Sequence, residues 1–554
     1  MPKNKPPLKI IPLGGLDGIG KNMTCFEYGN DMILIDAGLM FPDDDQPGID
    51  LVLPDYTYVL ENEEKLRGII ITHGHEDHTG ALPYLLQDLN PQVPIYSSKL
   101  TLGFVEGKLA EHRIQNRKLC EVSDGARIQL GAFTVNFFSM THSIPGALGI
   151  FFQTPQGSVM HTGDFKLDQT PIDGVLPNYY AINSFAHQGI DLLLSDSTNA
   201  TKPGYTPSEA EVGASLRHII KNATGKIFVS SFASHIHRLQ QICNFATACG
   251  RKVVVTGRSM VTNTRIARQL GYLHIADSDI IDAYDIDELP DDKVIVLCTG
   301  SQGEPLSALA RMANGEHKSL TITASDTVII SASPVPGNER SVQSIINSLS
   351  KIGCTIYDKS NTLVHVSGHS SQEELKLFLA MTHPRNFAPV HGEAVHLRAH
   401  AKLGRLMGVK PENIFVLDNG DTLEMRNGQV CIGTPVESGL VYVDGLNVGA
   451  TEPAVLRDRQ KLSQDGMVTC FVAIASRDRR VSEIEISCRG VSFANDEDLL
   501  SGAQDSVRDT LTRAANNTGS SLETLKKAAR NNLSNYLWNK THTRPIVIPV
   551  VMEV

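Results

Sequence analysis

The stretch "IIITHGHEDHTGALPYLL", residues 69–86, contains a dense group of side chains that can bind metal. An apolar run typical of a buried strand comes first, and three histidines and an aspartate follow within six positions. Imidazole and carboxylate ligands without thiolate are typical of hydrolytic Zn²⁺ or Mn²⁺ sites. A solvated polar turn is the alternative, but the density of ligands favours metal binding. We therefore expect His73, His75, Asp77 and His78 to be metal ligands at the end of a strand.

Other apolar runs also end in potential ligands. The first 200 residues read as short strands buried on both faces, and several of these strands end in Asp or His. Polar groups at strand ends, held by a rigid sheet, are the usual arrangement of a catalytic rim. His73 and His75 can bind one metal ion, and Asp77 and His78 can reach a second ion beside it. Four ligands cannot complete the coordination shells of two ions, so further ligands must come from elsewhere in the chain. The candidates are His142, Asp164 and His391.

Composition leaves the function open. A chain of 554 residues should divide into about two to four domains, and none of its apolar runs approaches the roughly 20 residues of a membrane span. The net charge of −11 gives no hint of nucleic acid, although a groove that carries metal ions can bind phosphate on an acidic protein. The nine cysteines form no C-x-x-C pair, which favours a reducing compartment, and the N-terminus does not resemble a signal peptide. We expect a cytoplasmic protein.

The pattern along the chain indicates an inserted domain. Ser208 and Glu211 form a capping-box pattern that opens a helix to about residue 221, and strands then alternate with helices as in a doubly wound parallel sheet. A β-rich segment that resembles the first region follows, then residues 441–465 without periodicity, and then a small α+β domain with helices near 496–516 and 521–537. The expected divisions are 1–207 and 369–445 for the two parts of the first domain, 208–368 for the insert, 446–465 for a linker and 466–554 for the C-terminal domain.

Taken together, these motifs resemble the metallo-β-lactamase superfamily. The H-x-H-x-D-H pattern, His142 after a strand and Asp164 in "HTGD" match it in order and spacing. The insert with "SDST" (195–198), "HVSGH" (365–369) and "PVHGE" (389–393) is similar to its β-CASP nuclease branch, and "PLGGLDGIGKNMT", "TGSQGEP" and "LSQDGMV" resemble the ribonuclease J family. The resemblance implies an α/β fold: an αββα sandwich, an inserted doubly wound parallel β-CASP domain and a small α+β C-terminal domain.

The resemblance also implies the roles of the ligands. It gives one metal to His73, His75 and His142, a second metal to Asp77, His78 and His391, and a bridging position to Asp164. Asp36 would support the ligand loop from behind. The expected cofactors are two Zn²⁺ ions, or Mn²⁺ or Mg²⁺, in each chain.

For the reaction, the resemblance implies two-metal hydrolysis of a phosphodiester. Asp77, Asp196 and His369 are the expected catalytic residues, with His369 as the general acid that Asp196 orients. The alternative is that His369 only binds phosphate. By the same resemblance, two turns should hold a 5′-monophosphate: "SFASHIHR" (231–238) and "HVSGH" (365–369). The alternative for the first turn is an ordinary helix start. The expected substrate-binding residues are Ala233, Ser234, His235, His365, Val366, Ser367, Gly368 and His369.

The expected function is a 5′-to-3′ exoribonuclease that prefers 5′-monophosphate RNA and also cuts internally, in RNA maturation and decay. A DNA-cutting β-CASP nuclease is the alternative, because the sequence does not reveal contacts to the 2′-hydroxyl. Hydrolysis of β-lactams or thioesters would not need the large insert, and a non-enzymatic scaffold would not keep all seven ligands. The resemblance suggests homodimers or homotetramers and association with RNA-degradation helicases or ribosomes.

Asp50 and Asp444 are candidate ligands of a structural Ca²⁺, or part of a solvated acidic loop.

Overall fold

The computed structural model describes residues 5–43, 45–304, 306–335, 337–449, 453–477, 479–515 and 521–554. The chain forms two compact units. Unit 1 comprises Met1–Phe41 and Val52–Val441, and unit 2 comprises Pro42–Leu51 and Tyr442–Val554. Strands β4 (Leu51–Pro54) and β21 (Leu440–Asp444) contain points at which the sequence passes from one unit to the other.

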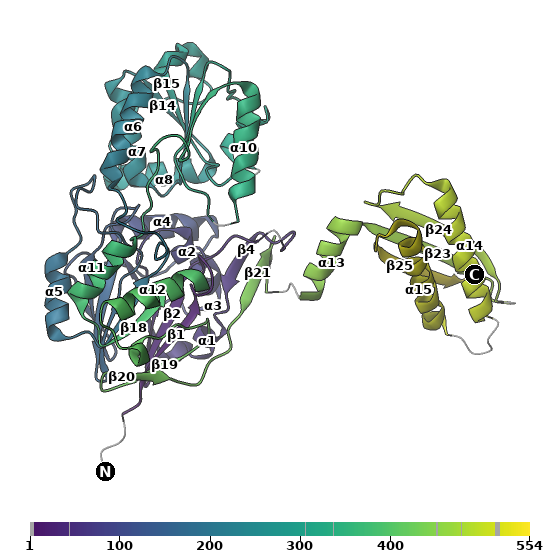
Figure 1. Ribbon diagram of the computed structural model, residues 1–554, viewed down its shortest axis with the longest axis horizontal. Helices are drawn as coiled ribbons and strands as arrows, with labels where there is room; N and C mark the ends of the chain where they lie inside the picture. The colour runs from purple at the N-terminus through teal and green to yellow at the C-terminus, as the bar shows by residue number, and fades with distance from the viewer. Residues whose placement is uncertain are drawn as a thin grey trace. The chain divides into compact units, whose positions relative to one another are not determined.

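Two mixed sheets form the sandwich of unit 1 (Figure 1). Their inner faces share one core, in which Phe26 and Phe152 pack edge to face with ring centroids 4.8 Å apart. The first sheet has the order β20-β19-β1-β2-β3-β5-β6-β7 and the second β18-β12-β11-β10-β9-β8. The strands are β1 Leu8–Gly14, β2 Met23–Tyr28, β3 Asp31–Ile35, β5 Leu66–Ile70, β6 Ile95–Ser97, β7 Leu119–Glu121, β8 Arg127–Leu130, β9 Phe133–Ser139, β10 Leu148–Thr154, β11 Gly157–His161, β12 Leu192–Asp196, β18 Asn386–Val390, β19 Leu423–Arg426 and β20 Gln429–Ile432.

Helices cover the outer faces of this sandwich. Apolar side chains of α5, α11 and α12 pack against the second sheet, and α4 contacts β6 and β7 of the first. Burial of these faces is the main source of their stability. The helices are α1 Thr57–Glu61, α2 Glu76–Thr79, α3 Leu82–Asp88, α4 Lys99–Glu111, α5 Tyr179–Gln188, α11 Gln372–Thr382 and α12 Ala394–Leu406. The predicted αββα sandwich is confirmed.

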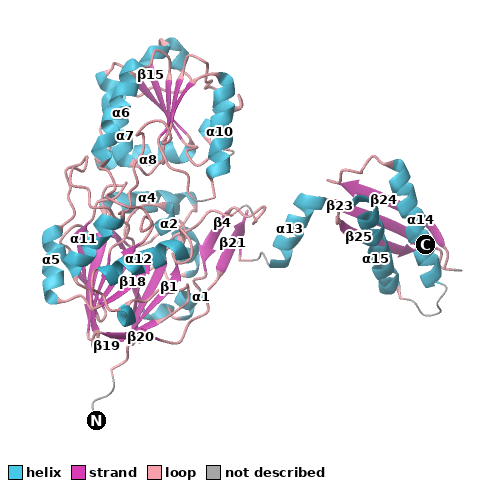
Figure 2. Ribbon diagram, viewed as in Figure 1, coloured by secondary structure: helices cyan, strands magenta, loops and turns pink. Residues whose placement is uncertain are grey.

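The inserted domain contains a five-stranded sheet in which every pairing is parallel. Helices cover both faces: α6, α7 and α8 pack in one apolar cluster and α9 and α10 in the other, and Figure 2 shows α6 and α7 on one side of the sheet and α10 on the other. The predicted doubly wound sheet is therefore confirmed, and the capping box of Ser208 and Glu211 is present. The order is β14-β15-β13-β16-β17, with β13 Ile227–Ser230, β14 Lys252–Thr256, β15 Val294–Cys298, β16 Thr327–Ile330, β17 Thr355–Tyr357, α6 Glu209–Asn222, α7 Ile236–Ala248, α8 Arg258–Leu270, α9 Ala308–Ala313 and α10 Glu339–Ile352.

The sequence pattern predicts a strand-to-helix turn at "HVSGH", but the segment "TLVHVSGH" (362–369) forms no strand before its turn. Residues 363–366 have no regular secondary structure. Their polar backbone atoms bond to side chains instead of to a sheet. Arg238 and Ser331 donate to the Val364 carbonyl, and Asn199 and Thr206 donate to the His369 carbonyl. These contacts satisfy the backbone without a ladder.

Unit 2 contains a three-stranded sheet of order β24-β23-β25 with α14 and α15 packed on one face. Its elements are β22 Asn447–Val448, α13 Pro453–Asp465, β23 Met467–Ile474, β24 Val481–Arg489, α14 Glu497–Ala515, α15 Leu522–Thr541 and β25 Ile546–Glu553.

The linker expected at 446–465 contains α13. This helix was missed because it has no strong apolar face, while its Ala, Leu, Arg, Gln and Lys residues favour a helix by propensity. The last residue of the helix expected at 496–516 lies outside the described residues. No described helix has the length and hydrophobicity of a membrane span.

Candidate metal centre

The predicted ligands meet at one edge of the sandwich, because each follows the end of a strand. His73 lies after β5, His142 after β9, Asp164 after β11 and His391 after β18. Asp77 and His78 lie on the short helix α2 that continues the β5 loop. Loops from four separated parts of the chain therefore contribute side chains to a single centre.

The first group consists of His73, His75 and His142. His75 Nδ1 lies 3.1 Å from His73 Nε2 and 3.2 Å from His142 Nε2. Burial lowers the pKa of His75 to about 4, and burial and neighbouring histidines hold the pKa values of His73 and His142 well below their usual range. Three neutral imidazoles converge here, and neutral imidazole is the form that binds metal.

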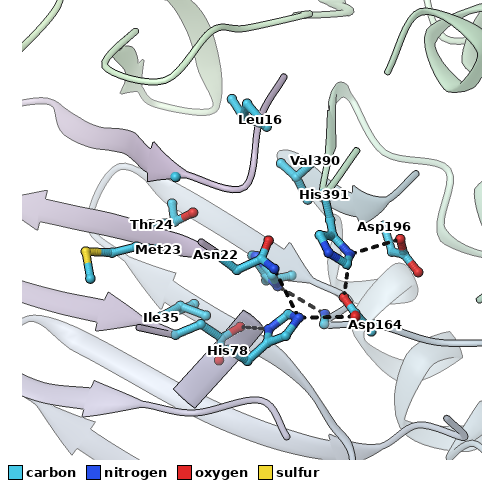
Figure 3. A pocket seen from close by; sticks show the side chains of 14 residues that line it. Leu16, Asn22, Met23, Thr24, Ile35, His78, Asp164, Asp196, Val390 and His391 are labelled. Atoms are coloured by element: carbon cyan, nitrogen blue, oxygen red, sulfur yellow. Dashed lines mark hydrogen bonds and ion pairs between the residues drawn. The ribbon is translucent and has the colours of Figure 1, made fainter. Parts of the chain in front are cut away.

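The second group consists of Asp77, His78, Asp164 and His391. Asp164 Oδ2 lies 3.1 Å from His78 Nε2, and Asp164 Oδ1 lies 3.0 Å from His391 Nδ1 (Figure 3). Asp77 Oδ2 lies 3.3 Å from His391 Nε2. Although burial opposes ionisation, the histidines hold the pKa values of Asp77 and Asp164 well below their usual range. The group thus brings two carboxylates and two imidazoles together.

Asp164 joins the two groups. Its Oδ2 atom also lies 3.8 Å from His73 Nε2 in the first group. The buried Nε2 atom of His391 lies 3.3 Å from Asp77 Oδ2 but makes no regular hydrogen bond in the described part of the chain. Buried polar atoms are nearly always satisfied, so a nitrogen that faces a carboxylate without a regular bond fits a metal ligand. The donor set therefore fits a pair of divalent cations with Asp164 between them.

Two hydrogen bonds orient the histidine ligands from behind. His78 Nδ1 donates to Asp36 Oδ2 over 2.7 Å, and His142 Nδ1 donates to the Gly368 carbonyl over 2.7 Å. Both bonds leave Nε2 directed into the centre. Asp36 also accepts from the Thr72 backbone N–H over 2.7 Å, and its φ of 61° is rare for a residue with a side chain. Asp36 thus contacts the ligand loop in the way that was expected.

The backbone of Gly368 must approach His142 closely to make its bond. A Cβ atom on Gly368 would lie 2.7 Å from the His142 ring, so only glycine fits there. The neighbouring Val366 side chain packs into the β-CASP core, so only its backbone is free to face a ligand. The "HVSGH" segment therefore contacts both the metal centre and the inserted domain.

The partly exposed His369 and the buried Asp196 form a pair beside the metal groups. His369 Nδ1 donates to Asp196 Oδ2 over 2.8 Å, and the His369 and His142 rings lie 5.0 Å apart. Although burial lowers the pKa of His369, Asp196 raises it, with a net upward shift. Asp196 and His369 also form a third possible ligand group with Asp164 and His391, so ligation is a geometric alternative to proton transfer.

The two turns expected to bind phosphate lie side by side. His235 and His365 have ring centroids 6.3 Å apart, one on the turn between β13 and α7 and the other on "HVSGH". His235 is buried, and its Nε2 lies 3.6 Å from Glu209 Oε1, whereas within the described ranges the Nδ1 atoms of His235 and His365 have no hydrogen-bond partner. Ala233 and Ser234 are half-buried on the first turn. Within the described ranges, one ring nitrogen of each histidine thus lacks a partner between these turns.

The sequence did not single out several residues that support the site. Asn22 Nδ2 donates to the Asp77 carbonyl and lies 3.1 Å from His78 Nε2. Asn199 Nδ2 donates to Ser367 Oγ over 2.8 Å and to the His369 carbonyl over 2.9 Å. Asn22 lies within the "PLGGLDGIGKNMT" motif and Asn199 directly follows "SDST", but short polar motifs do not reveal partners more than 50 residues away. The residue 14–20 loop bonds to Gly392, next to His391, which places this turn beside the site.

The calcium expectation remains a prediction. Asp50 and Asp444 both lie in unit 2. Asp50 accepts from the Gly445 backbone N–H over 2.7 Å, while Asp444 forms an ion pair with Arg459. The guanidinium therefore supplies positive charge where a cation would otherwise lie.

Comparisons with known proteins decide the family. Family models match in chain order: the metallo-β-lactamase superfamily at 16–230, the ribonuclease J β-CASP domain at 224–349, the Zn-dependent metallo-hydrolase RNA specificity domain at 356–417 and the ribonuclease J C-terminal domain at 454–554. Ribonuclease J of Mycolicibacterium smegmatis is 40% identical over 99% of this chain and 97% of its own length. The chain belongs to the ribonuclease J family.

Other ribonuclease J relatives are similarly close along their whole length. Ribonuclease J2 of Bacillus subtilis is 39% identical over 100% of both chains, and ribonuclease J of Thermus thermophilus is 40% identical over 99% of this chain and 95% of its own. A crystal structure of a protein of unknown function from Enterococcus faecalis matches 76% of this chain with a TM-score of 0.54 and 16% identity, which supports the fold alone. The domain boundaries at 207, 368, 445 and 465 remain predictions.

Proposed function

We propose that this member of the ribonuclease J family is a two-metal ribonuclease that removes nucleotides from 5′-monophosphorylated RNA in the 5′-to-3′ direction and also cuts internally. Family membership makes it a hydrolytic, metal-dependent ribonuclease. The observation that carries the two-metal part is the position of Asp164 between two groups of buried ligands. The match to an RNA specificity domain favours RNA over DNA.

The metal ligands proposed here are His73, His75 and His142 for one ion and Asp77, His78 and His391 for the other, with Asp164 shared. Imidazoles with carboxylates suit Zn²⁺ or Mn²⁺, and Mg²⁺ is the third candidate. When bound, two such ions would neutralise charge on the phosphate and activate the attacking water. The protein itself orients the ligands through Asp36 and the Gly368 carbonyl.

Proton transfer to the leaving 3′-oxygen is assigned to His369. Its Nδ1–H is fixed on Asp196, so Nε2 is the atom that would carry the transferred proton. Asp196 in turn accepts from the Thr198 N–H over 2.9 Å and from its hydroxyl over 2.8 Å, which holds the carboxylate still. Asp196 thus acts by orienting His369.

The 5′-phosphate preference is assigned to the two adjacent turns. The Nδ1 atoms of His235 and His365 and the Ser367 hydroxyl are available to donate to an anion, and turns before helices suit anions. The distance between such a pocket and the metal centre would place the first internucleotide bond for cleavage. Without a 5′ end in the pocket, RNA would be cut internally.

One assay tests this function. RNA carrying a 5′-monophosphate, 5′-triphosphate or 5′-hydroxyl, and matching DNA, is incubated with Mn²⁺, and product size is followed with time. We expect mononucleotides to be released fastest from monophosphorylated RNA. Equal or faster cleavage of DNA would move the chain to a DNA-processing role, and equal rates on all 5′ ends would exclude the phosphate pocket.

Ser367→Ala is expected to weaken only the preference for the 5′-phosphate. It removes a hydroxyl that accepts from Asn199 Nδ2 and from the His369 N–H and whose own proton is free for an anion, and one hydrogen bond to an anion corresponds to about tenfold in discrimination. The ratio of kcat/KM for 5′-monophosphate over 5′-hydroxyl RNA measures it. Ser370→Ala is the control, because the Ser370 hydroxyl donates to the Phe165 carbonyl instead. A change in kcat on both substrates, with the ratio intact, would contradict the assignment.

Homodimers or homotetramers, association with RNA-degradation helicases or ribosomes, roles in rRNA maturation and mRNA decay, and a cytoplasmic location remain predictions. The free thiol state of all nine cysteines is compatible with that location.

A further inference from the structure

Arg238 is a fully buried arginine that the reaction described above does not use. It is the third residue of α7 and is 0% exposed. Its Nε donates to Glu209 Oε1 over 2.7 Å, and its Nη1 donates to the Val364 carbonyl over 2.5 Å and to the Ser331 hydroxyl. A buried guanidinium is tolerated only where partners compensate its charge, so these contacts fix its position.

The contacts of Arg238 join the two turns of the proposed phosphate pocket. Arg238 lies three residues after His235, on the helix that follows the first turn. Val364 lies directly before His365, at the start of the second turn, and Ser331 Oγ donates to the same carbonyl over 2.8 Å. A single planar side chain therefore spans both turns, and the fork of a guanidinium suits this role.

Glu209, the partner of Arg238, connects the pair to the metal centre. The Glu209 backbone N–H donates to Asp168 Oδ2 over 3.0 Å. The Asp168 backbone N–H donates to Thr141 Oγ1 over 3.3 Å, and Thr141 directly precedes His142. A continuous series of hydrogen bonds thus runs from the two turns to the segment that carries a metal ligand.

We propose that Arg238 is a positioning residue for the 5′ end of the substrate: it sets the separation of the two turns and their distance from the metal centre. This inference rests on the proposed phosphate pocket. Arg238 does not touch the substrate, because its guanidinium is enclosed by Glu209, Ser331 and Val364. Its loss should therefore weaken recognition of the 5′-phosphate and leave the chemical step at the metals unchanged.

Arg238→Lys tests the inference. Lysine keeps a positive charge beside Glu209, which protects folding, but one ammonium cannot hold Glu209 and the Val364 carbonyl as the planar fork does. Arg251→Lys is the matched control. Arg251 is also buried in the insert, but it donates to the carbonyls of Gly225 and Val294, where strands β13 and β15 begin. Arg238 contacts Ser331, just after strand β16 ends, so the two arginines lie at opposite ends of the parallel strands.

Two readouts separate positioning from a general loss of structure. The first is binding of 5′-monophosphate against 5′-hydroxyl RNA in the presence of a chelator. The second is kcat for metal-dependent internal cleavage of a circular RNA, which has no 5′ end. For Arg238→Lys we expect the binding preference to fall about tenfold and kcat to stay within about twofold. Arg251→Lys should lower the unfolding temperature and keep the preference.

An unchanged preference in Arg238→Lys would overturn the inference, as would an equal loss of preference in both variants. If the unmodified protein binds the two RNAs equally, both the pocket and the inference fail. Cleavage of the circular RNA would then still report on the metal centre, so the two failures can be told apart.

Discussion

Replacing Asp164 with asparagine is expected to lower kcat at least about a thousandfold and to reduce the bound metal. Asp164 lies between the two ligand groups, with Oδ2 3.1 Å from His78 Nε2 and 3.8 Å from His73 Nε2. Asparagine keeps the shape but removes the negative charge that two adjacent cations need. Two-metal catalysis depends on both ions, so loss of either removes most of the rate enhancement. Initial rates on RNA and metal content by mass spectrometry measure the effect.

Asp191→Asn is the control for this prediction. Asp191 precedes β12 and accepts from the Ser158 N–H over 3.0 Å, at the end of the strand opposite Asp196. This control should keep its metal and its kcat. Full activity in Asp164→Asn with two ions retained would show that Asp164 does not bridge the metals.

Replacing His369 with alanine is expected to lower kcat on RNA by about 10²–10⁴-fold, the usual contribution of a general acid. The side chain is partly exposed, pairs with Asp196 over 2.8 Å and lies beside the His142 ring. Its loss removes the proton donor for the leaving 3′-oxygen. The seven proposed metal ligands stay in place, so metal content should not change.

A substrate with a different leaving group tests the acid role directly. A p-nitrophenyl phosphodiester releases a phenolate that needs no proton, so His369→Ala should cut it within about fivefold of the unmodified rate, since a proton donor contributes little there. Equal losses on both substrates would indicate that His369 binds phosphate. Loss of one metal ion would instead favour the third ligand group, in which His369 and Asp196 join Asp164 and His391.

Much of the fold, and the grouping of the candidate ligands, was predictable because both depend on local pattern. Apolar runs that end in Asp or His place those residues at strand ends, and strand ends of one sandwich meet at one edge. The alternation of strands and helices after Ser208 similarly indicates a parallel sheet. His73, His142, Asp164 and His391 therefore lie together as expected.

The supporting residues could not be predicted in the same way. Arg238 reads as one residue of an amphipathic helix, and only the folded chain places it against Glu209 and Val364. Asn199 contacts Ser367, 168 residues away, with no signal in either motif. Helix α13 lacks the apolar face by which helices are recognised. Contacts between distant polar residues have no periodicity, and they are what the sequence did not reveal.

The most direct test of the account is anomalous diffraction from crystals of the protein loaded with Mn²⁺ or Zn²⁺. The account predicts two peaks about 3.5–4 Å apart, the spacing of two-metal hydrolases, with Asp164 in contact with both ions. His73, His75 and His142 should surround one peak, and Asp77, His78 and His391 the other. A single peak, or a pair of peaks with Asp164 touching only one, would contradict it.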